Sequence, residues 1–142
     1  MKALVMDNDF INRRILQLLF TEFGRCDAAD SGNVTLSMVE DALKKRRPYS
    51  LIVLNTFSQV DWVKMLHEIK AMERSHALYG KDGARIMVMS SDTDKKTIIT
   101  AFRNQCDAFI QKPAKKREIK NALSSMGITP EPKSFNGLKF YK

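Results

Sequence analysis

The sequence has few cysteines and no long apolar run. Two cysteines in 142 residues, Cys26 and Cys106, are too few for a disulfide framework, and we expect both to be reduced thiols. No apolar stretch approaches the roughly 20 residues with which a helix crosses a bilayer. The opening residues 1–7 reach an acidic side chain too early for a signal peptide. These absences predict a cytoplasmic protein that does not contact a membrane.

Motifs for binding nucleic acid or metal are also absent. The formal net charge of +8 favours an anionic partner. The sequence nevertheless lacks helix-turn-helix, zinc-finger and single-strand-binding signatures, so we expect no nucleic-acid partner. The two histidines, His67 and His76, do not have the spacing to cysteines or acids that a metal site requires, and we interpret His67 as structural.

The composition is that of one globular domain. Hydrophobic residues make up 44% of the chain and charged residues 28%, which excludes a disordered or collagen-like protein. From Gly127 onward the composition shifts toward proline, serine and asparagine. We therefore predict a folded, monomeric domain over residues 1–128 and a C-terminal tail over residues 129–142.

Short apolar runs alternate with amphipathic stretches along the chain. The runs lack the polar–apolar alternation of a half-exposed strand, so they predict strands that are buried on both faces. Apolar residues at helical spacing predict a helix after each strand. The predicted strands cover residues 3–6, 26–29, 51–54, 86–89 and 108–110. Five strands that alternate with five helices specify an α/β fold with a doubly wound parallel sheet and right-handed crossovers.

Polar side chains follow four of the predicted strands. In a doubly wound sheet the functional crevice lies at the carboxyl ends of the strands. The residues there are Asp7-Asn8-Asp9, Asn55-Thr56, Ser90-Ser91 and Lys112-Pro113. Each residue has a structural explanation when taken singly, because Asp9 can cap the next helix and Lys112 can balance Asp7. The combination of an acid, a hydroxyl and a lysine followed by proline is more specific than any one of them.

The same strand ends lie within four stretches of a known pattern. Residues 4–13 are Leu-Val-Met-Asp-Asn-Asp-Phe-Ile-Asn-Arg, and residues 49–55, 86–91 and 107–113 follow in order and spacing. Together they resemble the receiver domains of bacterial response regulators, the CheY-like family, over roughly residues 2–126. The resemblance implies a three-layer, flavodoxin-like (βα)5 fold with strand order 2-1-3-4-5.

The resemblance also assigns roles to the strand-end residues. In the family, an aspartate after strand three accepts a phosphoryl group from a histidine kinase and holds Mg²⁺ together with two acids after strand one. A hydroxyl after strand four and a lysine after strand five contact the phosphoryl oxygens, and an aromatic residue in strand five acts as a switch. Carried over position by position, these roles fall on Asn55 as the acceptor equivalent, Asp7 and Asn8 as the acid pair, Ser90, Lys112 and Phe109. The family usually has a cis peptide bond before the proline, which we expect at Lys112-Pro113.

Two of the family's three acids are amides in this chain. A carboxylate attacks phosphorus with a negatively charged oxygen, whereas the Asn55 amide is neutral and a very poor nucleophile. Mg²⁺ prefers anionic oxygens, and Asn8 removes one of them. Asp9 is nearby, but we expect it to cap the helix rather than to bind metal. We therefore expect no catalytic residue, no cofactor and weak or absent Mg²⁺ binding, with Asp7 balanced by Lys112.

The loop after Asn55 departs from the family as well. The family commonly has Met-Pro followed by Asp-Gly, whereas residues 56–62 contain no proline and place Trp62 about where the glycine is expected. Two interpretations of Trp62 stay open. It either covers the crevice or packs against the helix that follows.

Our first hypothesis is an atypical receiver that acts through protein–protein contact without phosphorylation. Its partner is a signalling protein, either a histidine kinase or a downstream effector. The predicted contact surface is Phe109 with the basic cluster Lys115, Lys116 and Arg117. The cluster opens a helix, where cations oppose the helix dipole, so helix energetics do not explain it. It is either a solvated face or a docking site for an acidic partner.

The alternative is a sensor that binds a small anion at Ser90, Ser91 and Lys112, with Trp62 as a lid. Residual phosphotransfer through Asp7 or Asp9 is disfavoured, because neither acid occupies the acceptor position.

Overall fold

Strands and helices alternate along the chain, as the sequence predicts. The computed structural model describes residues 1–55, 62–91 and 94–130. The described elements are β1 (Lys2–Met6), α1 (Phe10–Phe20), β2 (Arg25–Ala29), α2 (Gly32–Lys44), β3 (Leu51–Asn55), α3 (Trp62–Ser75), the 3-10 turn η1 (Gly80–Asp82), β4 (Arg85–Ser90), α4 (Lys95–Arg103), β5 (Ala108–Gln111) and α5 (Lys116–Ser125). The loop after Asn55 and residues 131–142 of the predicted tail lie outside the described residues.

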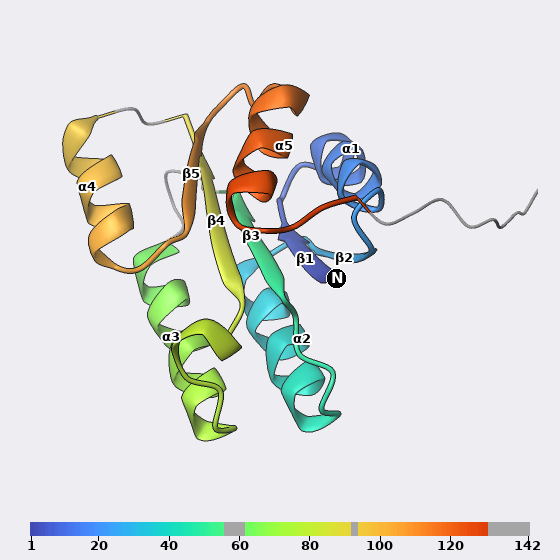
Figure 1. Ribbon diagram of the computed structural model, residues 1–142, viewed down its shortest axis with the longest axis vertical. Helices are drawn as coiled ribbons and strands as arrows, with labels where there is room; N and C mark the ends of the chain where they lie inside the picture. Colours follow the sequence, from blue (N-terminus) through green and yellow to red (C-terminus); the bar gives the residue numbers. More distant parts are fainter. Residues whose placement is uncertain (56–61, 92–93, 131–142) are drawn as a thin grey trace, which may run out of the picture.

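The five strands form one parallel sheet between two layers of helices (Figure 1). Their order is β2-β1-β3-β4-β5, so the predicted topology is confirmed. Buried residues of α1 and α5 belong to one core cluster, and those of α2, α3 and α4 belong to the other. Both faces of the sheet are therefore covered, which makes the predicted three-layer α/β fold.

The apolar runs become strands that are buried on both faces. In β3, Ile52 and Leu54 belong to the cluster under α2, α3 and α4, whereas Leu51 and Val53 belong to the cluster under α1 and α5. All four side chains are fully buried. Burying an aliphatic side chain of this size stabilises the fold by roughly 1.5–3 kcal/mol. Side chains that alternate between two apolar layers explain why the strand sequences lack a polar face.

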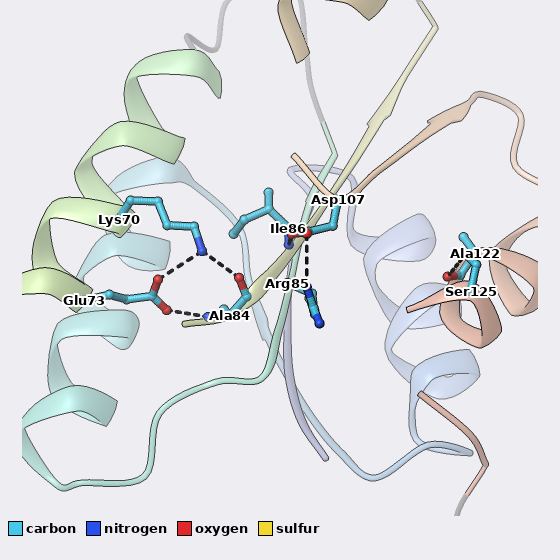
Figure 2. Close-up of polar contacts among 8 residues, drawn as sticks. All are labelled: Lys70, Glu73, Ala84, Arg85, Ile86, Asp107, Ala122 and Ser125. Atoms are coloured by element: carbon cyan, nitrogen blue, oxygen red, sulfur yellow. Dashed lines mark hydrogen bonds and ion pairs between the residues drawn. The ribbon is translucent and has the colours of Figure 1, made fainter. Parts of the chain in front are cut away.

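A buried carboxylate links α3 to the start of β4 (Figure 2). Glu73 is only 2% exposed, accepts a hydrogen bond from the Ala84 backbone N (2.7 Å) and pairs with Lys70 Nζ at 3.2 Å. Lys70 Nζ also donates to the Ala84 carbonyl at 2.7 Å. A Cβ atom at Gly83 would collide with this carboxylate, so the turn before β4 requires glycine. We call these contacts of Glu73 with Lys70 and the Ala84 backbone the Glu73 clamp. The clamp joins α3 to β4 at the end of the sheet opposite to the carboxyl ends of the strands.

None of the helices in the described ranges has the length and apolarity that a membrane span requires.

Candidate functional site

The carboxyl ends of the central strands bring the predicted site residues to one edge of the sheet. Asn55 ends β3 and Ser90 ends β4, and both are buried. Asp7 follows β1 and extends its pairing, because its backbone N donates to the Ala29 carbonyl at 3.0 Å. Lys112 follows β5, where its backbone N donates to the Ser90 carbonyl at 2.8 Å. The parallel register thus places these four residues side by side.

Asp7 is the centre of this edge, with no exposed surface. Its Oδ2 accepts hydrogen bonds from the side-chain amides of Asn55 and Asn12, both at 2.5 Å. Its Oδ1 accepts from the Asp9 backbone N at 2.9 Å. Hydrogen bonds to both oxygens satisfy a buried carboxylate that would otherwise be costly to desolvate. Neutral N–H donors therefore occupy positions around both Asp7 carboxylate oxygens that a metal ion would need.

Asn55 is almost completely buried, and its orientation follows from Asp7. The amide nitrogen faces the carboxylate, because the reversed amide would bring its carbonyl oxygen against a negatively charged oxygen. The carbonyl oxygen, Oδ1, receives no hydrogen bond from the described part of the chain. The acceptor position of the resemblance thus holds a hydrogen-bond donor to Asp7 rather than a second anionic oxygen.

Asn8 and Asp9 are exposed to solvent and do not line the buried part of the crevice. Both residues are exposed, and Asp9 Oδ2 accepts from the Asn12 backbone N at 2.8 Å as the N-cap of α1. The structure therefore shows the capping role for Asp9 that the sequence favours. Asn8 and Asp9 therefore do not form a buried acid cluster beside Asn55.

The residues at this edge do not fit Mg²⁺. The ion takes octahedral oxygen ligands and gives up its water reluctantly. Among the described residues of this edge, Asp7 is the buried carboxylate and already accepts hydrogen bonds from three N–H groups, and position 55 offers a neutral oxygen. The described residues contain no group of three histidine, cysteine, aspartate or glutamate side chains suited to a metal ion.

Lys112 carries a positive charge at this edge. Its side chain is half-buried, and desolvation lowers its pKa, while the negative charge of Asp7 acts in the opposite direction. The Lys112-Pro113 peptide bond is cis, as expected from the resemblance. The charges of Lys112 and Asp7 thus act on each other, and hydrogen bonds to the Asp7 carboxylate come from Asn12, Asn55 and the Asp9 backbone.

Two contributors to the site escaped the sequence analysis. Asn12 donates its side-chain amide to Asp7, and Arg13 donates from a guanidinium nitrogen to the Asp7 carbonyl at 2.9 Å. Both residues lie in the first turn of α1. Side chains in the first turn of a helix lean toward the helix N-terminus. A polar residue one turn after a strand-end acid is therefore the sequence pattern that predicts such a contact.

Trp62 and Phe109 pack against the same core cluster. Both are partly buried against the layer formed by α2, α3 and α4. This contact agrees with the packing interpretation of Trp62. The basic cluster Lys115, Lys116 and Arg117 stands at the start of α5, whose buried residues belong to the opposite layer. Phe109 and the cluster therefore border the edge strand β5 from opposite faces of the sheet.

An exposed apolar face on α1 was not predicted. It consists of Phe10, Ile11, Ile15 and Leu18, each more than half exposed. The buried side of the same helix is formed by Leu16 and Phe20. Grouped exposed apolar side chains of this size are typical of protein-binding surfaces. Next to this α1 apolar face, Glu22 pairs with Lys116 and Lys120 at 3.2 and 3.1 Å, so basic residues of α5 border it.

Comparison with known proteins identifies the fold. No family model matches the sequence, and no curated protein matches it. The receiver domain of the histidine kinase CKI1 from Arabidopsis thaliana, solved with Mg²⁺, is 21% identical, with a TM-score of 0.72 over 88% of this chain and 90% of that chain.

Two bacterial structures show the same likeness. A chain of the CheX–CheY–BeF3–Mg²⁺ complex from Borrelia burgdorferi is 17% identical, with a TM-score of 0.73 over 91% of this chain and 90% of that chain. The putative pilus assembly protein CpaE from Burkholderia thailandensis is also 17% identical, with a TM-score of 0.67 over 89% of this chain and 98% of that chain. The protein therefore has the fold of a CheY-like receiver domain.

Proposed function

We propose that the protein is a signalling module of the receiver class that acts through protein–protein contact and takes up no aspartyl phosphate. The observation that carries this proposal is the hydrogen bond from Asn55 to Asp7 at the position of the phosphoacceptor. An amide nitrogen that donates to a carboxylate has no free electron pair with which to attack phosphorus. The acceptor equivalent thus serves as an internal partner of Asp7.

The hydrogen bonding of Asp7 supports the same proposal. Phosphoryl transfer depends on positioning and on cations that neutralise the developing charge. In this protein, Asp7 is satisfied by three N–H donors, and Asn8 points to solvent without a charge. The crevice therefore stays stable with neither Mg²⁺ nor phosphate.

Contact with a partner protein is the route that we propose for the signal. The CheX–CheY complex shows a protein of this fold assembled with another protein. On our chain the α1 apolar face is bordered by Lys116 and Lys120 of α5. We propose a signalling protein, such as a histidine kinase or a downstream effector, that presents apolar residues within an acidic rim. The contact surface predicted from the sequence, Phe109 with Lys115, Lys116 and Arg117, is a second contact area at the β5 edge.

Incubation with acetyl phosphate and Mg²⁺, followed by intact-mass spectrometry, tests the proposal. We expect no phosphoryl adduct on the wild type. The double variant Asn8→Asp with Asn55→Asp is the positive control, since it restores both acids. A base-labile adduct on Asp7 or Asp9 of the wild type would overturn the proposal.

The alternative function, a sensor of a small anion at Ser90, Ser91 and Lys112, makes a separate prediction. It rests on the positive charge of Lys112 at the crevice, and Trp62 is the single tryptophan of the chain. A ligand at this edge gives a saturable change in Trp62 fluorescence that Lys112→Gln abolishes. An interaction module gives no such change.

A further inference from the structure

A basic cavity lies at the end of the sheet opposite to the candidate site. Its volume is about 460 Å³, and it is bounded by the edge strand β2, helix α2 and the residues that precede β3. Lys2 begins β1 and Arg25 begins β2, and the register pairs these two residues. Arg47 and Tyr49 complete the wall from the connection between α2 and β3. A cavity of this size is typical of small-molecule sites.

The charges that line this cavity do not cancel. Four cationic side chains, Lys2, Arg25, Lys45 and Arg47, face two carboxylates, Asp27 and Asp41, which leaves a net charge of +2. Both carboxylates are engaged by other lining residues. Asp27 pairs with Arg25 Nε at 3.1 Å and accepts from the Tyr49 hydroxyl at 2.6 Å, and Asp41 pairs with Lys45 Nζ at 3.0 Å. The two cations of the lining that are left besides these ion pairs are Lys2 and Arg47.

The Lys2 side chain reaches the backbone of Arg47, and both residues line the cavity. Lys2 Nζ donates to the Arg47 carbonyl at 2.7 Å and lies 4.5 Å from the centroid of the Tyr49 ring. Burial lowers the pKa of Lys2, the charges of Arg25 and Arg47 act in the same direction, and the charges of Asp27 and Asp41 act in the opposite direction. Cations that repel each other beside a fixed aromatic ring are stabilised when an anion enters between them.

We propose that this cavity binds a small soluble phosphate monoester, with the phosphate between Lys2 and Arg47. A phosphate dianion matches the net charge of the lining, and guanidinium groups bind phosphate oxygens in a bidentate manner. The cavity exceeds the volume of phosphate alone. Its apolar wall, which includes Met38 and Ala42, accommodates an organic part of the ligand. This site is independent of the proposed function, since it lies at the other end of the strands.

The test is a titration of the ¹⁵N-labelled full chain with inorganic phosphate and with AMP, monitored by ¹H–¹⁵N correlation spectra at constant ionic strength. We expect saturable shifts for the amides of Arg25, Arg47 and Tyr49, and tighter binding of AMP than of phosphate. The amides of Asn55 and Ser90 stay in place. Chloride in place of phosphate gives no saturable shift.

Arg47→Gln and Arg46→Gln form a matched pair of variants. Both remove one positive charge from exposed, adjacent residues, but only Arg47 lines the cavity. Loss of a charge-assisted hydrogen bond to phosphate weakens binding roughly tenfold or more, so we expect this for Arg47→Gln and no comparable loss for Arg46→Gln. Lys2→Gln behaves like Arg47→Gln. Equal weakening by Arg46→Gln and Arg47→Gln, or shifts that do not saturate, would overturn the proposal.

Discussion

Asn55 donates its side-chain amide to Oδ2 of Asp7 across the paired strands β3 and β1. The two side chains meet where both are buried, with 1% and 0% exposure. A carboxylate at position 55 would place two negative charges in contact at this point, which is tolerable only with a cation between them. The amide removes that requirement. The Asn55 amide therefore stabilises the buried Asp7 carboxylate through a hydrogen bond.

The first prediction concerns the charge that Asn55→Asp introduces. Repulsion from Asp7 raises the pKa of the buried acid pair in the folded state above the value of an unfolded aspartate. A carboxyl whose folded pKa is raised destabilises the fold at high pH and ceases to do so as it takes up a proton. Urea unfolding at pH 7 should show a loss of roughly 1–3 kcal/mol relative to the wild type, and a smaller loss at pH 5.

Asn121→Asp on the exposed side of α5 is the control for this variant. It adds the same charge without burial, so its stability should stay within roughly 0.5 kcal/mol of the wild type at both pH values. An Asn55→Asp protein that is as stable at pH 7 as at pH 5 would contradict the buried contact with Asp7.

Magnesium binding requires two changes at once. Asn55→Asp alone restores one anionic oxygen, but Asn8 still contributes no charge, so we expect weak Mg²⁺ binding from this variant. Asn8→Asp together with Asn55→Asp should bind more tightly than either single variant. Isothermal calorimetry with MgCl₂ measures the difference, and tight binding by the unmodified protein would refute our description of the crevice.

The fold was accessible from the sequence because its strands are buried on both faces. Ile52 and Val53 are apolar neighbours that enter opposite core layers, which explains why the run 51–54 contains no polar residue and predicts a buried strand. Because the functional crevice of such a sheet lies at the carboxyl ends of its strands, the sequence also predicts that Asp7 and Asn55 lie at the same edge. It does not predict the contact between them. That the two side chains are in hydrogen-bond contact depends on their positions in the folded sheet, which the sequence pattern does not specify.

The environment of α1 and α3 could not be derived in the same way. Helix α1 has apolar residues on two sides, and periodicity does not determine which side meets the sheet. Leu16 is buried, whereas its neighbour Ile15 is 56% exposed. Glu73 is an acid in a charged helix, where a solvated position is the normal expectation. The burial of Glu73 depends on its contacts with Lys70 and the Ala84 backbone N. The turn at Gly83 brings that backbone group to the Glu73 carboxylate.

The clamp of Glu73 leads to a stability prediction. Glu73→Gln removes the charge opposite Lys70, whose side chain is only 17% exposed, and leaves that ammonium without its anionic partner. Breaking a largely buried pair in this way costs roughly 3 kcal/mol. Glu40→Gln is the matched control, since Glu40 pairs with Lys44 at 3.8 Å on the surface and such pairs contribute at most about 1 kcal/mol. Equal losses in urea unfolding would show that the clamp does not stabilise the α3–β4 connection.

The two thiols should be unreactive in the folded protein. Burial raises the pKa of Cys26 to about 12 and that of Cys106 to about 11. The thiolate is the reactive form, so at pH 8 fewer than about one thiol in a hundred is ionised, compared with about a quarter for a free cysteine. Ellman's reagent should therefore label the native protein at least tenfold more slowly than the urea-unfolded protein. Rapid labelling of either thiol in the native state would show that its region opens easily.

The last prediction separates the two sides of α1 by a pair of adjacent residues. Ile15 belongs to the α1 apolar face, and Leu16 is 5% exposed within the core shared with α5. Leu16→Ala leaves a cavity and should lower the free energy of unfolding by roughly 2–5 kcal/mol, whereas Ile15→Ala should change it by less than about 0.5 kcal/mol. If the α1 apolar face binds the signalling partner, Ile15→Ala weakens that complex in spite of its normal stability. Removal of an aliphatic contact from a partner interface accounts for this loss, because the exposed side chain becomes buried only in the complex. Chemical denaturation and affinity measurements on the two variants distinguish a contact surface from a second packing side of the helix.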